Sequence, residues 1–194
     1  MAFENAGVFF EQGAASPAKT TVGVGAASIS TVAATEYGEG NLHKTVLTLT
    51  AVPLTLRDTE QGKGIKIYDF PEGRILILGS TGSIAVTTTS ILANTLNASS
   101  TLSWGVGTTT QANGTVATTE QNILNASTAT SSATINVAGT AGTGYGVLAP
   151  IDGTGTAIDA YLNIGVPTGT DIDADATVTV TGTITITWIN LGDY

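Results

Sequence analysis

Residues 177–188 read Thr-Val-Thr-Val-Thr-Gly-Thr-Ile-Thr-Ile-Thr-Trp, the clearest periodic segment of the chain. Apolar side chains alternate with Thr along it, and a period of two places the two kinds on opposite faces of a β-strand. Gly182 interrupts the apolar series and indicates a bulge, a bend or a close approach of backbone. The stretch therefore predicts a strand with one face in a core and a ladder of Thr on the other.

Similar alternation recurs in shorter segments along the chain, at residues 158–166, 102–106, 135–137 and 65–68. Residues 45–56 are also extended in pattern, although Pro53 lacks a backbone donor and predicts a sheet edge or a bend there. Residues 118–125 depart from the pattern: a Thr three residues before Gln121 matches a capping box and predicts a single short helix. We therefore predict an all-β chain, a jelly-roll-like antiparallel β-sandwich with one short helix and an extended N-terminal arm.

Charge and composition bear on the domain organisation. Residues 1–74 carry six basic and eight acidic side chains, whereas residues 75–194 carry no basic and seven acidic ones. The change falls inside residues 73–79, which read as one buried strand, so it does not indicate a domain boundary. Residues 13–27 and 138–146 are rich in Gly, Ala and Ser and hold too little apolar area to fold on their own. We predict a single β-sandwich domain over residues 31–194, and an arm or first strand over residues 1–30 that contacts another protein chain.

Composition also excludes several classes of protein. The chain has no Cys, which removes thiol catalysis, disulfides and Cys-based zinc sites. Its formal charge is −9 with only six basic residues, so we expect no nucleic-acid partner. No apolar run approaches the roughly 20 residues that cross a bilayer, and we expect no membrane partner.

Candidate catalytic groups are few. His43 is the only histidine, and no Gly-X-Ser-X-Gly elbow supplies a nucleophile. Glycoside hydrolysis requires two carboxyl groups across a cleft lined by aromatic side chains, and the second half of the chain has few aromatics. Its carboxylates, among them Asp152 and Asp159, are better explained as solubilising surface groups. We expect a protein that is not an enzyme and uses no cofactor.

Two motifs suggest ligand binding without completing a known site. Asp171, Asp173 and Asp175 match the opening of an EF-hand loop, but its sixth and twelfth positions hold Ala176 and Gly182 instead of Gly and Glu. We therefore assign no metal site, although a looser cation site shared with a neighbouring chain stays open. The glycine-rich run 139–146 is followed by no helix-forming segment and no Lys-Ser/Thr pair, so it does not predict a phosphate loop.

The most distinctive local sequence is residues 63–74, which combine three basic side chains with Tyr68, Phe70 and a Pro-Glu-Gly turn. Two interpretations stand beside each other. The segment is either a hairpin corner whose aromatic side chains pack inward, or a contact site for a partner, because mixed charge around aromatic anchors is typical of interfaces.

Several stretches resemble a group of small virion proteins of tailed bacteriophages, the decoration or cement proteins of the capsid. Residues 67–79 (Ile-Tyr-Asp-Phe-Pro-Glu-Gly-Arg-Ile-Leu-Ile-Leu-Gly) and 183–194 (Thr-Ile-Thr-Ile-Thr-Trp-Ile-Asn-Leu-Gly-Asp-Tyr) carry the resemblance most clearly. The opening residues 1–7 and the piece 119–123 are similar too. These motifs are structural and include no catalytic signature.

The resemblance implies a subunit that binds the outside of a phage head and cements neighbouring major capsid subunits against the internal pressure of DNA. The chain would be made in the host cytoplasm, reside on the capsid exterior and act as a homo-oligomer, a dimer or a trimer. The residues that we expect to contact the capsid are Phe3, Phe9, Phe10, Lys44, Arg57, Lys63, Lys66, Tyr68 and Arg74. The alternative is a carbohydrate-binding or adhesion module on the virion surface, which exposed aromatic side chains along a groove would favour.

Overall fold

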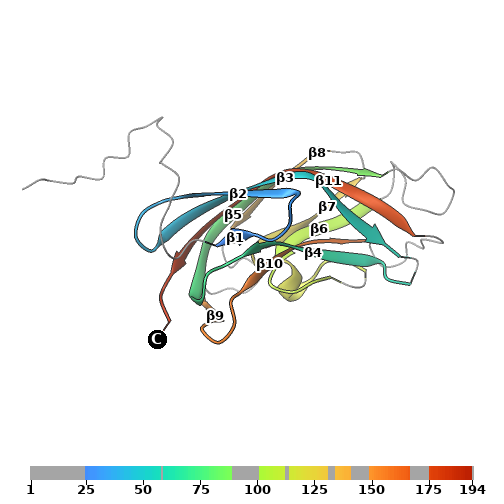
Figure 1. Cartoon of the computed structure of the whole chain (residues 1–194). Coiled ribbons are helices and arrows are strands. Elements are labelled where there is room, and N and C mark those ends of the chain that lie inside the picture. The colour runs from blue at the N-terminus through green and yellow to red at the C-terminus, as the bar shows by residue number, and fades with distance from the viewer. Residues whose placement is uncertain are drawn as a thin grey trace, which may run out of the picture.

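The computed structural model describes residues 25–57, 59–88, 101–111, 114–130, 134–140, 149–166 and 175–193, and nearly all of their regular structure is β-strand. The strands are β1 (Ala26–Ala27), β2 (Val32–Tyr37), β3 (Leu42–Leu56), β4 (Gly62–Asp69), β5 (Gly73–Thr88), β6 (Thr101–Gly107), β7 (Leu124–Thr130), β8 (Thr134–Thr140), β9 (Ile151–Gly153), β10 (Asp159–Gly165) and β11 (Ala176–Asn190). They form two antiparallel sheets that face each other (Figure 1).

The topology is that of a jelly roll. One sheet has the order β1-β4-β10-β6-β7, and the other has the order β2-β3-β11-β5-β8 with β9 added beside β5. Eight strands remain when β1, β2 and β9 are set aside. The first of them pairs with the last (β3 with β11) and the second with the seventh (β4 with β10). The third pairs with the sixth (β5 with β8), and the two middle strands pair with each other (β6 with β7). This nested pairing is what a long hairpin produces when it is rolled into two sheets, and it confirms the predicted fold class.

The periodic segment 177–188 lies in β11, the central strand between β3 and β5. Its apolar side chains are buried and its Thr side chains lie on the outer face, as the alternation predicts. The pairing with β3 shifts register between Val180 and Gly182. Gly182 has φ +151°, and a Cβ there would collide with the Ser83 carbonyl oxygen, so the predicted bulge and the predicted close approach are both present.

Pro53 also has a clear position. It lies opposite Thr179 in β11, whereas β2 pairs with β3 only as far as Leu49. Beyond Leu49, β3 has no second neighbour among the described strands, so the missing donor of Pro53 lies where β3 forms the edge of its sheet. This confirms the predicted edge position.

The predicted helix at residues 118–125 is much shorter. Only Thr118–Glu120 form a 3-10 helix, η1, and β7 begins at Leu124. The N-cap is Ala117, whose methyl group cannot accept a hydrogen bond, so only half of a capping box forms: the Glu120 carboxylate accepts a hydrogen bond from the Ala117 backbone N–H at 2.8 Å. The chain leaves the helical path because Ile123 and Leu124 are buried in the core, Leu124 opposite Val106 of β6.

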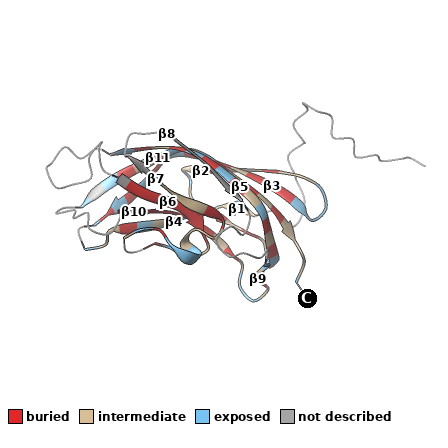
Figure 2. Cartoon of the chain, turned by 180° about the vertical axis from the view of Figure 1, so that it is seen from behind, coloured by how far each residue is buried: buried red, intermediate tan, exposed pale blue. Residues whose placement is uncertain are grey.

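The core lies between the two sheets (Figure 2). Both sheets contribute branched aliphatic side chains to it, and both Trp side chains, Trp104 and Trp188, are 1% exposed or less. The ring of Phe70 packs edge-on against Trp188, and that of Tyr68 packs edge-on against Phe70. For the segment 63–74, this packing favours the interpretation as a hairpin corner with inward aromatic side chains.

Candidate functional site

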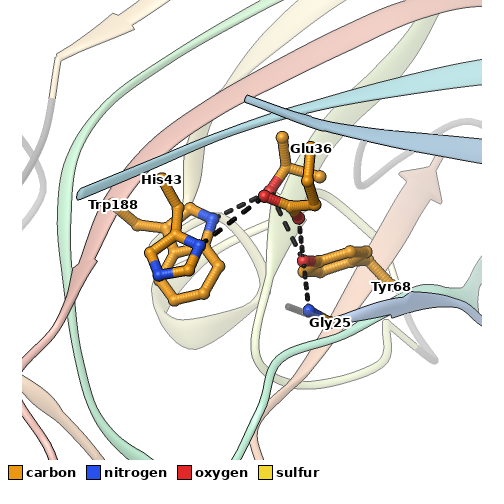
Figure 3. A network of polar contacts seen from close by, with 6 residues as sticks. Gly25, Glu36, His43, Tyr68 and Trp188 are labelled. Atoms are coloured by element: carbon orange, nitrogen blue, oxygen red, sulfur yellow. Dashed lines mark hydrogen bonds and ion pairs between the residues drawn. The ribbon is translucent and has the colours of Figure 1, made fainter. Parts of the chain in front are cut away.

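A cluster of polar side chains lies inside the sandwich, where β2, β3, β4 and β11 meet (Figure 3). Glu36 of β2 is its centre and is only 6% exposed. One of its carboxylate oxygens, Oε1, accepts hydrogen bonds from the hydroxyls of Thr45 (2.6 Å) and Tyr68. The other, Oε2, faces Nδ1 of His43 at 3.8 Å. We call Glu36, His43, Thr45, Tyr68 and Trp188 the buried polar cluster.

Two further contacts connect this cluster to its surroundings. The Trp188 indole N–H donates to the Thr45 hydroxyl oxygen at 2.8 Å, and the His43 ring stacks on the Trp188 ring with centroids 3.9 Å apart. The Tyr68 hydroxyl oxygen accepts a hydrogen bond from the Gly25 backbone N–H at 3.0 Å. The cluster therefore joins the two sheets and fixes the residue that precedes β1.

The electrostatics favour an ionised carboxylate in the cluster. Burial by itself raises the pKa of Glu36, but His43 and the hydroxyls of Thr45 and Tyr68 outweigh burial and bring the pKa below its ordinary value. Burial, followed by the hydrogen bond to Glu36, raises the pKa of Tyr68, which therefore stays protonated and acts as a donor. All five side chains are at most 6% exposed, so their contacts are made inside the sandwich and link strands of both sheets.

Part of the outer face of the sheet that contains β4, β6 and β10 is covered by the chain itself. Asn163 of β10, fully buried, accepts a hydrogen bond from the Gln111 backbone N–H and donates to the carbonyl oxygens of Thr109 and Glu120, each at 2.8 Å. At Gly107 and Gly165, the covering segment packs so closely that a Cβ would collide with its backbone. Residues 108–111 and 114–120 are thereby held against this sheet.

The outer face of the opposite sheet consists largely of small and β-branched side chains. Thr residues of β11 lie between Lys44, Val46 and Thr48 of β3 on one side and Thr81 and Ser83 of β5 on the other. No outward position of β2, β3, β5 or β11 carries a carboxylate. On a chain with a net charge of −9, this acid-free face is the candidate docking surface.

The structure does not gather the predicted contact residues into one patch. Lys44 and Arg74 are exposed on the acid-free face. Arg57 lies at the turn between β3 and β4, where its backbone pairs with Glu60. Lys63 is exposed on β4, and Lys66 is on the outer face of the opposite sheet. The five basic residues therefore do not form a single basic patch, because they lie on strands of both sheets and at the turn after β3.

Two of the predicted residues have little capacity to bind a partner. The Lys66 ammonium is ion-paired with Asp159 at 2.6 Å and with Asp69 at 3.1 Å, and chiefly its hydrogen bond to Asp159 raises the pKa of Lys66. Tyr68 is a correction: its side chain is fully buried in the polar cluster and is not available for contact. Phe3, Phe9 and Phe10 lie outside the described residues, as do residues 1–24 of the predicted arm.

Two of the carboxylates that the sequence singles out, Asp152 and Asp159, make local contacts at the surface. Asp159 binds Lys66 and accepts a hydrogen bond from the Tyr161 hydroxyl at 3.0 Å, whereas Asp152 accepts hydrogen bonds from Thr154 in the turn after β9. Asp171 and Asp173 lie outside the described residues, and Asp175 is exposed just before β11. In the part of the chain that is described, no three His, Asp or Glu side chains are grouped as metal ligands.

Sequence reasoning missed the buried polar cluster, although a signal was present. In β2, a period of two places Val32, Ala34 and Glu36 on the same inward face. An acidic residue at an inward position requires partners in the core, and the partners come from strands that are distant in sequence.

No family model matches the chain, and neither the curated proteins nor the solved structures contain a match. Within the described residues, no helix is long and apolar enough to span a membrane.

Proposed function

We propose that the chain is a non-enzymatic structural protein of a tailed-phage virion that binds the outer surface of the head and cements neighbouring shell subunits. The observation that carries the proposal is the acid-free face over β2, β3, β5 and β11, on a chain with fifteen acidic residues. A sheet face whose strands present Lys44 and Arg74 but no carboxylate suits contact with another protein. Acidic groups elsewhere on the surface would discourage adhesion to packaged DNA.

Two further observations agree with a passive binding role. The single histidine is buried in the polar cluster, where it stacks on Trp188. The resemblance of residues 67–79 and 183–194 to capsid decoration proteins falls on β4, β5 and β11, which are framework strands of the jelly roll. We propose the major capsid protein as the partner and a dimer or trimer as the working form, because several weak contacts then act together.

The alternative, carbohydrate binding, has less support among the described residues. Jelly rolls also occur in lectins, but sugar sites use exposed aromatic rings for stacking. Of the aromatic residues that the structure describes, Tyr68, Phe70, Trp104 and Trp188 are at most 2% exposed, and Tyr37 and Tyr161 are half-buried.

Electron microscopy of phage particles that carry or lack this protein separates the two proposals. We expect density on the outer shell to disappear in its absence, together with release of DNA at a lower temperature. Intact heads of unchanged heat resistance that fail to adsorb to host cells would refute cementing and support the adhesion module.

A further inference from the structure

Two chains of hydrogen bonds in the buried polar cluster end on the Glu36 carboxylate (Figure 3). In the first, the Trp188 indole N–H donates to the Thr45 hydroxyl, which donates to Glu36 Oε1. In the second, the Gly25 backbone N–H donates to the Tyr68 hydroxyl, which also donates to Glu36 Oε1. A hydroxyl has one proton, so the Tyr68 oxygen accepts from Gly25 while its own proton is directed at the carboxylate.

Gly25 fits against Tyr68 because it has no side chain. A Cβ at this position would collide with the Asp69 carbonyl oxygen and with the ring and hydroxyl of Tyr68. Only without that atom does the Gly25 N–H come within 3.0 Å of the Tyr68 hydroxyl oxygen. The contact therefore depends on glycine at the residue that precedes β1.

The segment that follows Gly25 has few other attachments. β1 is two residues long, and among the described strands it pairs only with β4, opposite Tyr68 and Asp69. One further backbone hydrogen bond, from the Ser28 N–H to a carbonyl oxygen of β4, has a length of 3.3 Å. Ile29 then packs against the core. A segment with so few contacts opens locally at a low free energy, so the Tyr68 hydroxyl is an important attachment for residues 25–28.

Two titratable side chains face Glu36 inside the cluster. His43 of β3 places Nδ1 3.8 Å from Oε2, and Tyr68 of β4 contacts Oε1. Burial raises the pKa of Glu36, but hydrogen bonds from His43, Thr45 and Tyr68 lower it by more. Burial, and then the bond to Glu36, raises the pKa of Tyr68, so Tyr68 remains a donor as the pH falls.

The charged side chains at neighbouring positions point away from the cluster. Lys44 of β3 is exposed on the acid-free face, and Asp69 of β4 is ion-paired with Lys66 on the outer face of the other sheet. On the strand of the carboxylate itself, Tyr37 is half-buried, and Glu39 is exposed after the strand ends. Protonation inside the cluster therefore concerns the carboxylate and the imidazole beside it.

We propose that the buried polar cluster is an acid-sensitive latch that holds residues 25–28 on β4. The ionised Glu36 carboxylate keeps the Tyr68 proton turned towards itself, and the Tyr68 oxygen then accepts the Gly25 N–H. Protonation of Glu36 removes this charge-assisted bond, so the hydroxyl is no longer held as an acceptor and residues 25–28 detach while the two sheets stay folded.

The latch is closed at neutral pH. Because the pKa of Glu36 lies below its ordinary value of 4.5, the carboxylate is ionised above about pH 4.5 and the latch opens as the pH falls through the folded-state pKa. Gly25 is the point at which residues 1–24 join the sandwich, so the latch fixes where the preceding chain begins. It operates whatever partner the protein binds.

Hydrogen exchange of the full chain, followed by NMR from about pH 7 to about pH 3.5, tests the latch. We expect the protection factors of the Gly25 and Ser28 amides to fall at least about tenfold below about pH 4.5, while the amides of β11 stay protected. In Glu36→Gln, the two amides should be weakly protected at every pH. The matched control is Asp152→Asn, which removes an exposed carboxylate whose pKa is also lowered, chiefly by hydrogen bonds from Thr154, and should keep the wild-type response.

Four outcomes would overturn the latch. They are protection of Gly25 and Ser28 that persists to about pH 3.5, a pH response that survives in Glu36→Gln, simultaneous loss of protection in β11, which indicates global unfolding, and a midpoint above about pH 5, which indicates His43 instead. If Glu36→Gln does not fold, Tyr68→Phe supplies the second variant, because it keeps the ring and lacks the acceptor. It should expose the Gly25 amide at neutral pH as acid does in the wild type, and wild-type protection there would also overturn the latch.

Discussion

Replacing Tyr68 by Phe removes one hydroxyl from the buried polar cluster and leaves the aromatic ring in place. That hydroxyl donates to the Glu36 carboxylate and accepts from the Gly25 backbone N–H. A hydrogen bond to a charged group contributes about 1.5–3 kcal/mol and a neutral one about 1 kcal/mol. We therefore expect the free energy of unfolding to fall by about 3 kcal/mol, a large share of the roughly 5–15 kcal/mol that is typical of a domain.

Urea denaturation followed by Trp fluorescence measures this loss, because Trp188 stacks on His43 and hydrogen-bonds to Thr45 within the cluster. A loss of about 3 kcal/mol corresponds to a melting temperature roughly 6–12 °C lower in a chain of this size. Hydrogen exchange at residues 25–29 should accelerate as well, since Gly25 loses its partner.

The matched control is Tyr161→Phe. The Tyr161 hydroxyl also donates to a carboxylate, Asp159, at 3.0 Å, but its side chain is half-buried at the surface. Water replaces a lost hydrogen bond there, so we expect a loss below about 1 kcal/mol. Equal losses in the two variants would refute the reasoning that burial gives the Tyr68 contacts their strength.

The remaining predictions concern the same fold. The Glu36 pKa lies below its ordinary value of 4.5. The ionised Glu36 carboxylate therefore contributes to stability above about pH 4.5, and this contribution is lost as the pH falls through the pKa of the folded state. Urea midpoints measured from about pH 7 to about pH 3 should decline less steeply in Glu36→Gln than in the wild type. Asn163→Ala leaves three buried or half-buried backbone groups, those of Gln111, Thr109 and Glu120, without their partner and should cost about 3 kcal/mol or more, measured by urea denaturation. A loss under about 1 kcal/mol would show that these three residues do not depend on Asn163 for their position. Gly165→Ala forces a Cβ into the Gly114 carbonyl and should lower the melting temperature, with Gly155→Ala, where the added Cβ meets open space, as the control. Deletion of residues 1–20 should lower occupancy on phage heads, and unchanged occupancy would contradict an arm that contacts another chain.

The strands could be predicted from the sequence because their physical cause is local. Alternation along residues 177–188 and 158–166 forces apolar groups to one face whichever partner strand is chosen, and β11 and β10 lie there. The bulge at Gly182 and the edge position of Pro53 could also be predicted. A residue without a side chain allows a close approach of backbone, and a residue without a backbone N–H cannot complete a sheet on both sides. The predicted helix at residues 118–125 was wrong in length, because a capping box is a weak local signal and the burial of Ile123 and Leu124 in the core outweighs it.

The contact residues were less predictable, because charge along a sequence does not determine which face of a sandwich a residue occupies. Lys44 and Lys66 both lie in strand-like segments of the sequence. In the structure, Lys44 lies on the acid-free face, whereas Lys66 is ion-paired with Asp159 on the opposite sheet. Tyr68 read as a contact residue because it stands among charged groups, whereas the pairing of distant strands places it over Glu36.

Strands with one Thr-rich face and one apolar face follow from the local sequence of this protein, since a period of two acts within a single strand. Which of those faces is left open follows only from the packing of distant segments. Residues 108–111 and 114–120 pack on part of one outer face, around Asn163, whereas Leu42 and Leu78 at the end of the other outer face are exposed to water. The reason is physical: covering a face depends on contacts between residues far apart in the chain, and a bulge at Leu78 depends on the register of two strands.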